Sequence, residues 1–397
     1  MRIGMMSDNY TTHISGVTNY ISLSKRFLEH EGHEVYVFTF DKVGGVAEED
    51  NVIYTPGIPI TDFYLNFFYN QPAKLLLSSM DIVHVHHPFI SGILARRYCK
   101  PRNIPIVFTN HTRYDLYTQT YLPILPKLIG DGSLKAYLSQ FYRACDLVII
   151  PSNSMHQVLV ENFGLDSPFV VIPNGVDLEP FCKDNEPVDR EIFGYSKDNV
   201  ISIFVGRLAP EKNLVFLLRV FQKVAMSDPH VRLLLVGDGP ERKNLETQVK
   251  RMGIGSKVFF TGMIPYKDVP HYLAASDLFI TPSGSEVFPL ATIEAIGSGL
   301  PVLGINALGT SDMIEDGITG LLSPEDLDLF AAKLTLLSTD HKLRQELGKK
   351  ALQASKKYDI RITTNMLIQQ YERLVEAARS RNKSTRFKPS RFLDRSQ

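Results

Sequence analysis

Two cations in the second half of the chain have the spacing to bind a diphosphate. Arg207 and Lys212 stand five residues apart in VGRLAPEKN, between an apolar run and a helical pattern. A guanidinium can hold phosphate oxygens through two hydrogen bonds, and an ammonium acts as a point charge. The pair therefore suits a diphosphate whose charge grows as it leaves. Charged residues beside turns are also common on protein surfaces. These two residues alone are therefore compatible with ordinary solvated surface cations as well.

Two carboxylates surround a predicted helix start further along the chain. Glu286 and Glu294 are separated by seven residues within SGSEVFPLATIEA, and Pro289 between them suits the first position of a helix. The N–H groups of the helix start can meet phosphate, while the carboxylates accept hydrogen bonds from sugar hydroxyls. Alternatively, Glu286 is a capping charge and Glu294 a helix surface residue. Paired acids also fit a glycoside hydrolase, which needs a carboxyl separation of ~5–9.5 Å.

The first strand-to-helix loop, from Ser7 to Val17, offers a different signal. It has no GxGxxG, which argues against a nicotinamide-dependent oxidoreductase. Gly16 at the head of the following helix lets backbone approach a ligand, although it can equally be an ordinary turn glycine. The histidines at 84, 86 and 87 lack evident carboxylate partners, so we interpret them as structural or cleft-lining and predict no metal.

Short apolar runs alternate with amphipathic stretches and would position these residues. The predicted strands are Arg2–Met6, Glu34–Phe40, Ile82–His86, Ile106–Thr109, Leu147–Pro151, Phe169–Ile172, Val200–Val205, Arg232–Val236, Val258–Thr261, Leu278–Thr281 and Pro301–Gly304. The predicted helices are Val17–Glu31, Leu214–Ala225, Pro240–Met252, Leu290–Gly297, Leu327–Leu337 and Ile360–Ala378. This order indicates an α/β protein with two doubly wound parallel sheets. We place the seam in the polar stretch Cys182–Asn199 and predict domains at 1–183 and 184–365, with a C-terminal helix and basic tail at 366–397 packing back toward the first domain.

Composition limits the class of protein. The chain has 397 residues, with 43 Lys+Arg balancing 43 Asp+Glu, so a uniformly basic nucleic-acid surface is excluded. Three scattered cysteines favour neither a disulfide framework nor a metal cluster. No apolar run reaches the ~20 residues of a membrane span, and the polar start lacks a signal-peptide core. We expect a cytoplasmic protein that can still be peripheral on the inner face of the cell membrane.

These motifs occur together in a fixed order. The second half of the chain contains GRLxxEK, the two glutamates, GxPV at 299–302 and VGDGP at 236–240. They are preceded by GHEV at 32–35 and PNGVD at 173–177. This set resembles the retaining GT-B glycosyltransferases of family 4 over most of the chain. The resemblance implies two Rossmann-like domains facing a central cleft, the first for the acceptor and the second for a nucleotide sugar such as UDP-glucose. It also implies a hexosyltransferase that needs no metal or cofactor.

The resemblance implies a role for each matched residue. Arg207 and Lys212 would bind the diphosphate and stabilise the departing nucleotide, Glu294 would hold the ribose, and Glu286 would contact the donor sugar. The remaining donor contacts implied are His111, Gly16 and the backbone of Phe288, Pro289, Leu290 and Ala291. Family members usually carry glycine where Pro289 stands, and the paired glycine of the first loop is Ser15-Gly16 here. These departures leave the identity of the donor sugar open.

The first half of the chain bears on the acceptor. Its motifs around Asp8, Tyr10, Tyr114 and Tyr117 are similar to the branch that glycosylates diacylglycerol. A lipid acceptor is therefore expected, with a sugar phosphate, phosphatidylinositol or a polysaccharide precursor as the alternative. A non-catalytic nucleotide-sugar binding protein is a second alternative.

Two segments fit an anionic membrane surface. Tyr117–Phe141 mixes apolar side chains with lysines, and the tail after Ala378 is strongly basic. A helix packed on its own core and a soluble disordered tail explain the same residues. No recognised RNA-binding module supports a nucleic-acid partner.

Overall fold

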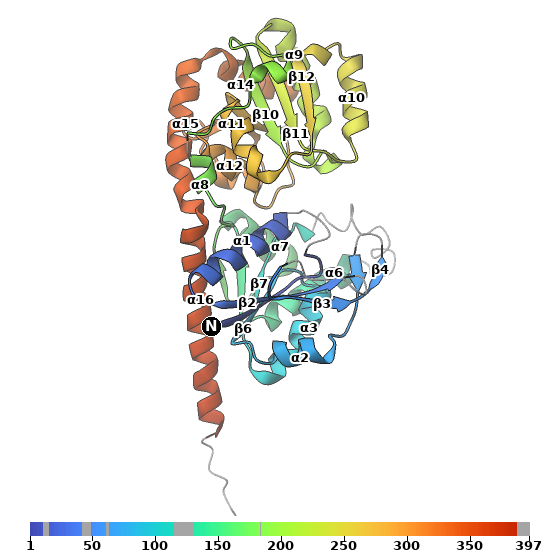
Figure 1. The fold of residues 1–397 in the computed structure, drawn as a ribbon, viewed down its shortest axis with the longest axis vertical. Helices are drawn as coiled ribbons and strands as arrows, with labels where there is room; N and C mark the ends of the chain where they lie inside the picture. Colours follow the sequence, from blue (N-terminus) through green and yellow to red (C-terminus); the bar gives the residue numbers. More distant parts are fainter. Residues whose placement is uncertain (11–15, 42–48, 61–62, 115–130, 183, 387–397) are drawn as a thin grey trace, which may run out of the picture.

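A computed structural model describes residues 1–10, 16–41, 49–60, 63–114, 131–182 and 184–386 of the chain (Figure 1). Its first half contains a seven-stranded sheet in the order β3-β2-β1-β6-β7-β8-β9, in which every neighbouring pair is parallel. Its strands are β1 (Arg2–Met6), β2 (Glu34–Asp41), β3 (Val52–Pro56), β6 (Ile82–Val85), β7 (Ile106–Thr109), β8 (Leu147–Ile150) and β9 (Phe169–Val171). The helices around it are α1 (Gly16–His30), α2 (Gln71–Leu77), α3 (Ile90–Tyr98), α6 (Asp131–Ala144) and α7 (Asn153–Phe163), and β4 (Ile58–Ile60) pairs with β5 (Phe63–Leu65) in a separate antiparallel hairpin.

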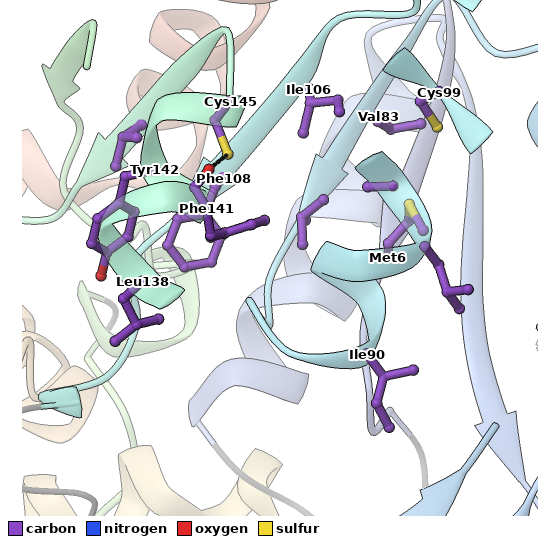
Figure 2. Packing of buried hydrophobic residues seen from close by; sticks show 14 of the residues in the cluster. Met6, Val83, Ile90, Cys99, Ile106, Phe108, Leu138, Phe141, Tyr142 and Cys145 are labelled. Carbon is purple, nitrogen blue, oxygen red and sulfur yellow. Dashed lines mark hydrogen bonds between the residues drawn. The ribbon is translucent and has the colours of Figure 1, made fainter. Parts of the chain in front are cut away.

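The central strands of this sheet are buried on both faces. All four residues of β6, β7 and β8 are buried, as expected when helices cover a parallel sheet. On one face, the Phe108 ring meets Phe141 at 5.0 Å and Tyr142 at 5.8 Å between ring centroids (Figure 2). Leu138, Phe141 and Tyr142 of α6 thus belong to the core. The interfacial interpretation of this part of Tyr117–Phe141 is therefore wrong, and residues 115–130 lie outside the described residues.

The second half contains a six-stranded parallel sheet in the order β12-β11-β10-β13-β14-β15. Its strands are β10 (Val200–Val205), β11 (Val231–Val236), β12 (Val258–Gly262), β13 (Leu278–Thr281), β14 (Val302–Ile305) and β15 (Gly320–Ser323). Its helices are α8 (Glu179–Cys182), α9 (Leu214–Ser227), α10 (Arg242–Arg251), α11 (Val269–Ala274), α12 (Leu290–Gly297), α13 (Thr310–Met313), α14 (Leu327–Thr339) and α15 (His341–Ser355). Phe193 and Tyr195, within the predicted seam, are buried in the core of this second sheet. This mostly polar stretch therefore contributes two aromatic side chains to the core of the second domain.

The last helix, α16 (Ile360–Arg386), runs back along the first domain (Figure 1). Leu367 and Tyr371 pack in a cluster that includes Ile3 of β1 and Val107 of β7. Arg379 extends this contact through an ion pair with Asp81 at 2.9 Å. The boundaries after residues 183 and 365 remain proposals, and residue 183 itself is outside the described part. None of the helices that the structure describes is long and apolar enough to cross a membrane.

A glycine at the domain junction allows α16 to approach closely. A Cβ on Gly175 would lie 2.1 Å from Thr363 Oγ1 and 2.8 Å from the Ile360 Cα, both in the first turn of α16. We predict that Gly175→Ala lowers the free energy of unfolding by about 1–3 kcal/mol, because backbone must shift. Denaturant unfolding measures the loss. Gly255→Ala is the matched control, since its Cβ would meet nothing within 4 Å. Equal stabilities of the two variants would contradict the prediction.

Candidate functional site

The predicted donor residues of the second domain lie at the point where its strand order reverses. Arg207 and Lys212 follow β10, and Glu286 follows β13, which is the neighbour of β10 on the side away from β11. In doubly wound sheets, ligands bind at the carboxyl ends of strands at such a switch point. The Ser283 hydroxyl after β13 donates to the Glu211 carbonyl at 3.0 Å and ties the two loops together. Sheet order thus brings two distant motifs to one place.

Lys212 and Glu286 form an ion pair between these loops, from Nζ to Oε1. Their side chains are 23% and 18% exposed, so both are partly withdrawn from water. Lys212 ends a short 3₁₀ turn, Pro210–Lys212, which is followed by Asn213 with a φ of 54°. Arg207 is exposed, and its guanidinium makes no hydrogen bond or ion pair with any residue in the described ranges. One cation is therefore held by a carboxylate and the other is available to a ligand.

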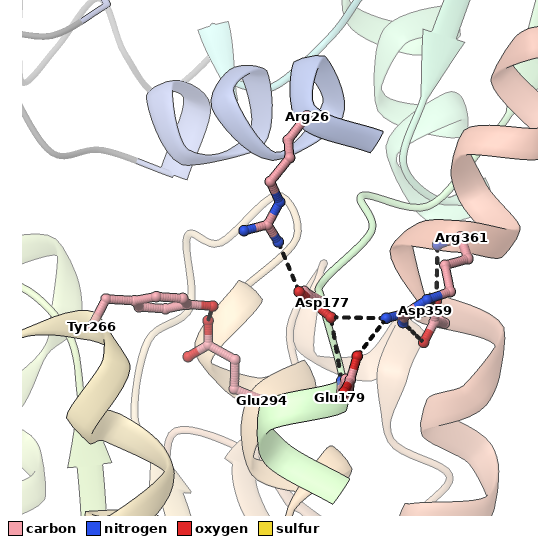
Figure 3. Close-up of polar contacts among 7 residues, drawn as sticks. All are labelled: Arg26, Asp177, Glu179, Tyr266, Glu294, Asp359 and Arg361. Carbon is pink, nitrogen blue, oxygen red and sulfur yellow. Dashed lines mark hydrogen bonds and ion pairs between the residues drawn. The ribbon is translucent and has the colours of Figure 1, made fainter. Parts of the chain in front are cut away.

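Glu294 is buried in the middle of α12, at 6% exposure. Its Oε1 accepts a hydrogen bond from the Tyr266 hydroxyl at 2.9 Å (Figure 3). Burial raises the pKa of Glu294 to about 7, although the bond from Tyr266 opposes this shift. The alternative of a surface glutamate is therefore excluded. Instead, the residue is a buried acceptor whose charge changes near neutral pH.

The start of α12 presents backbone donors. Pro289 occupies the position just before the helix, with φ −72° and ψ 106°, one residue earlier than the sequence predicts. No side chain caps the helix from this position, so the N–H groups of Leu290 and Ala291 donate no hydrogen bond to a capping side chain. The N-terminus of a helix favours a negative charge. Together with Lys212, it forms a site suited to phosphate oxygens.

The loops of the second domain contact the first domain. Val287, which follows Glu286, and Leu308 pack against the core of the first domain. The Ser154 hydroxyl at the start of α7 donates to the Asp312 carboxylate in α13. At the domain junction, Asp177 accepts from Arg26 of α1 at 2.7 Å and pairs with Arg361 of α16 at 3.5 Å (Figure 3). The carboxyl-end loops of both sheets therefore meet.

His111 and Gly16 are the donor-side candidates of the first domain. His111 follows β7, and its Nε2 lies 3.1 Å from Nδ1 of the buried His86. Burial and the neighbouring histidines hold the pKa of His111 well below its usual range, so the ring is neutral. Gly16 begins α1 and is exposed, and a Cβ there would meet nothing within 4 Å among the described atoms. Both residues follow strands of the first sheet at its carboxyl edge.

The acceptor-side candidates have structural partners. The Asp8 carboxylate accepts hydrogen bonds from the Ser91 N–H at 2.6 Å and the Ile90 N–H at 3.2 Å, and thus caps α3. The Tyr10 hydroxyl donates to Glu49 at 2.8 Å. Tyr114 is buried, at 2% exposure. Tyr117 lies outside the described residues. The structure therefore gives Asp8 and Tyr10 bonds within the first domain and does not bring them to Lys212.

Sequence reasoning missed two partners of the predicted site. Tyr266, which binds Glu294, stands 28 residues before it and carries no motif that links the two. His86, which contacts His111, is one of three neighbouring histidines in the sequence, and their spacing carries no signal for this contact. Among the residues described, no group of three or more His, Cys, Asp or Glu side chains has the arrangement of a metal site.

Two protein-family models match the chain. The model described as "Glycosyl transferases group 1" matches residues 185–354, and the model described as "Glycosyltransferase Family 4" matches residues 14–180. The predicted resemblance is thereby confirmed on both halves of the chain.

Several characterised proteins are similar over most of their length. Alpha-monoglucosyldiacylglycerol synthase of Streptococcus pneumoniae is 30% identical, covering 87% of this chain and 82% of that protein. The Acholeplasma laidlawii protein of the same name is 29% identical, covering 83% and 86%. D-inositol 3-phosphate glycosyltransferase of Kribbella flavida is 28% identical, covering 75% and 72%.

Solved structures share the two-domain architecture. Sucrose-phosphate synthase from Thermosynechococcus elongatus superposes with a TM-score of 0.78 at 20% identity, covering 95% of this chain and 99% of that one. Anabaena HepE in complex with UDP-glucose superposes with a TM-score of 0.73 at 20% identity, covering 95% and 100%. At this identity the likeness concerns the fold alone. The predicted GT-B fold is confirmed by it.

Proposed function

Because the chain belongs to the GT-B glycosyltransferases of group 1 and family 4, we propose that it is a retaining hexosyltransferase that moves glucose from a nucleotide diphosphate to a lipid hydroxyl. The proposed acceptor is 1,2-diacylglycerol, and UDP-glucose is the proposed donor. The observation that carries the proposal is the meeting of the Lys212 loop with the Glu286 loop and the start of α12 at the sheet's switch point. No resident metal or cofactor is part of the proposal.

The donor binds where the Lys212–Glu286 ion pair now stands. The diphosphate takes Lys212 as its partner, together with Arg207 and the N–H groups of Leu290 and Ala291. Glu286 is released and accepts hydrogen bonds from the hexose hydroxyls. One anion replaces another beside Lys212, so the ammonium keeps a partner throughout. Glu294, in its charged form, accepts bonds from the ribose hydroxyls.

Transfer proceeds on one face of the hexose. The bond from the anomeric carbon to the phosphate oxygen breaks, and the bond to the acceptor oxygen forms. The acceptor proton passes to the leaving phosphate oxygen, so no side chain is needed as a nucleophile. Arg207 and Lys212 offset the charge that grows on the diphosphate, a form of electrostatic stabilisation. Contact of Val287 and Leu308 with the first domain supports exclusion of water from the donor.

A cationic surface on the first domain supports a membrane lipid as acceptor. α3 begins at the Asp8 cap, at the carboxyl edge of the first sheet, and ends in a shallow depression that Arg96, Arg97 and Lys100 line. Arg97 donates to the Phe67 carbonyl at 2.9 Å and lies over the Phe68 ring at 5.0 Å. Phe67 and Phe68 are 50% and 58% exposed. Apolar side chains interleaved with cations suit an anionic bilayer interface. We infer that this surface, rather than α6, places the protein on the inner face of the membrane.

Charge reversal tests that surface. We expect Arg96→Glu/Lys100→Glu to weaken binding to vesicles containing anionic phospholipid at least ~10-fold, since each cation near such a leaflet contributes about 1 kcal/mol. Vesicle sedimentation at fixed salt measures the change. Lys349→Glu/Lys350→Glu on α15 carries the same change in charge on exposed residues of the second domain and should bind like the wild type. Equal binding by both double variants would refute the surface.

A soluble acceptor is the second candidate, because the D-inositol 3-phosphate glycosyltransferase relative is similar over most of its length. The deciding experiment incubates purified protein with a panel of nucleotide sugars and with both diacylglycerol vesicles and soluble acceptors, and identifies the products by mass spectrometry. A glucosylated diacylglycerol formed from UDP-glucose supports the proposal. A glycosylated soluble acceptor and unmodified lipid would overturn the acceptor, and no product with any donor would overturn the transferase itself.

A further inference from the structure

A row of buried histidines lies beneath His111. His84 and His86 are two residues apart at the end of β6, both at 0% exposure, and their rings stand 4.2 Å apart between centroids. Both nitrogens of His84 are occupied, with Nδ1 at 2.6 Å from the Tyr371 hydroxyl and Nε2 at 2.6 Å from Thr109 Oγ1. His86 differs. Its Nδ1 meets Nε2 of His111 at 3.1 Å, while its own Nε2 is buried without a partner among the described residues.

The unpartnered His86 Nε2 indicates which ring nitrogens of His86 and His111 carry protons. Burial keeps the pKa values of His86 and His111 well below their usual range, so each ring is neutral and carries one N–H. A proton on His86 Nε2 would be a buried donor without an acceptor, which costs ~1–3 kcal/mol. Buried orphan N–H groups are also rarer than buried orphan acceptors. His86 therefore carries its proton on Nδ1 and donates it to His111 Nε2.

The second ring follows from the first. Because His111 Nε2 accepts, its single proton must be on Nδ1. That nitrogen has no hydrogen-bond partner in the described part of the chain, and the His111 side chain is half-buried rather than enclosed. The edge of the Tyr20 ring, 4.9 Å from His111 and 5.8 Å from His86 between centroids, packs against both rings. His111 thus has a fixed ring with one free N–H.

We propose that His86 is a positioning residue that holds His111 in the Nδ1–H tautomer, so that His111 offers a hydrogen-bond donor to a hydroxyl oxygen of the hexose being transferred. The inference rests on the proposed function for its substrate. It assigns the direction of the hydrogen bond, since a hydroxyl accepts from His111 rather than donating to it. A hexose that lacks an oxygen at that position would lose the contact.

The tautomer can be measured without substrate. Histidine ring ¹⁵N spectra distinguish Nδ1–H from Nε2–H, and the His111 signals are identified by their loss in His111→Gln. We expect the Nδ1–H form of His111 in the wild type. His86→Leu removes the donor with similar bulk and should move His111 toward the Nε2–H form. His86→Asn keeps an N–H near the Nδ1 position and should restore the wild-type form.

Kinetics with the nucleotide sugar give the second readout. We expect His86→Leu to lower kcat/KM about tenfold, the effect of one lost hydrogen bond, and His86→Asn to recover most of it. Tyr371→Phe is the matched control, because it removes a bond from His84 in the same buried row and leaves the His86–His111 contact intact. It should lower stability without changing the tautomer or kcat/KM.

An Nε2–H tautomer of His111 in the wild type would overturn the inference, as would unchanged spectra and kinetics in His86→Leu. An effect of Tyr371→Phe on kcat/KM equal to that of His86→Leu would also overturn it, because the row would then act only through stability. If wild-type His111 has the predicted tautomer but the protein transfers no sugar, the proposed function fails and the assignment of the protons stands.

Discussion

Replacing Lys212 by alanine should lower kcat at least ~100-fold, the loss expected when one group that stabilises transition-state charge is removed. The ammonium lies at the switch point beside Glu286, where the diphosphate departs in the proposed reaction. Charge on that group is greater in the transition state than in the bound donor. The loss should therefore appear in kcat. Replacing a residue that only binds the donor would instead raise KM and leave kcat unchanged.

Stability separates this loss from misfolding. The side chains of the Lys212–Glu286 pair are 23% and 18% exposed, so Lys212→Ala leaves a mostly buried carboxylate without its partner. The free energy of unfolding should fall by ~1–3 kcal/mol, which leaves the protein folded. Lys223→Ala is the matched control, because Lys223 pairs with Asp328 on the solvent side of α9. The control should keep wild-type kcat. A Lys212→Ala enzyme with near-wild-type kcat would refute the role of this residue in turnover.

Glu294→Gln is expected to weaken donor binding and to stabilise the protein at the same time. The glutamine retains an oxygen that can accept from Tyr266, but it has no charge to attract the ribose hydroxyls. Hydrogen bonds to a charged group contribute ~1.5–3 kcal/mol, so the Kd for UDP-glucose at pH 8 should rise about tenfold or more. Isothermal titration calorimetry measures this change.

In Glu294→Gln, the binding of UDP-glucose should also lose its dependence on pH. With a pKa of about 7, Glu294 must release a proton before the charged form can hold the ribose. In the wild type, the affinity should therefore fall about tenfold from pH 8 to pH 6. The diphosphate of a nucleotide sugar stays ionised over this range, so the change belongs to the protein. A flat profile in the wild type would contradict the assignment of Glu294.

The stability effect has a defined sign. The folded state keeps the Glu294 proton up to a pH of about 7, whereas the unfolded chain loses it near the ordinary glutamate pKa of 4.5. Stability thus falls as pH rises between these values, and the full cost is present above pH 7. The wild type should therefore lose up to about 3 kcal/mol in its free energy of unfolding between pH 5 and pH 8 through Glu294. Glu294→Gln does not have this loss, so its stability relative to the wild type should rise by the same amount over this range. Glu346→Gln, on the exposed face of α15, should gain nothing.

The local pattern of the sequence determined most of the second domain and the identity of its donor motifs. The bounds of β10, β13 and α12 agree with the predicted ranges, because β10 and β13 are mostly apolar runs and α12 begins directly after Pro289. β3 and β15 escaped prediction, since one ends in Pro56 and the other is a four-residue segment that begins with glycine. Whether short strands of this kind form depends on the packing of their side chains against neighbouring strands.

Only the tertiary structure decided what each site residue contacts. Lys212 and Glu286 are 74 residues apart and meet because β10 and β13 are adjacent in the sheet. Asp8 caps a helix more than 80 residues away, and the shifted pKa of Glu294 comes from its burial. Motifs specify which chemical groups are present, because side-chain chemistry is local to the residue. Partners, burial and charge state depend on which strands are neighbours, and long-range packing sets that order.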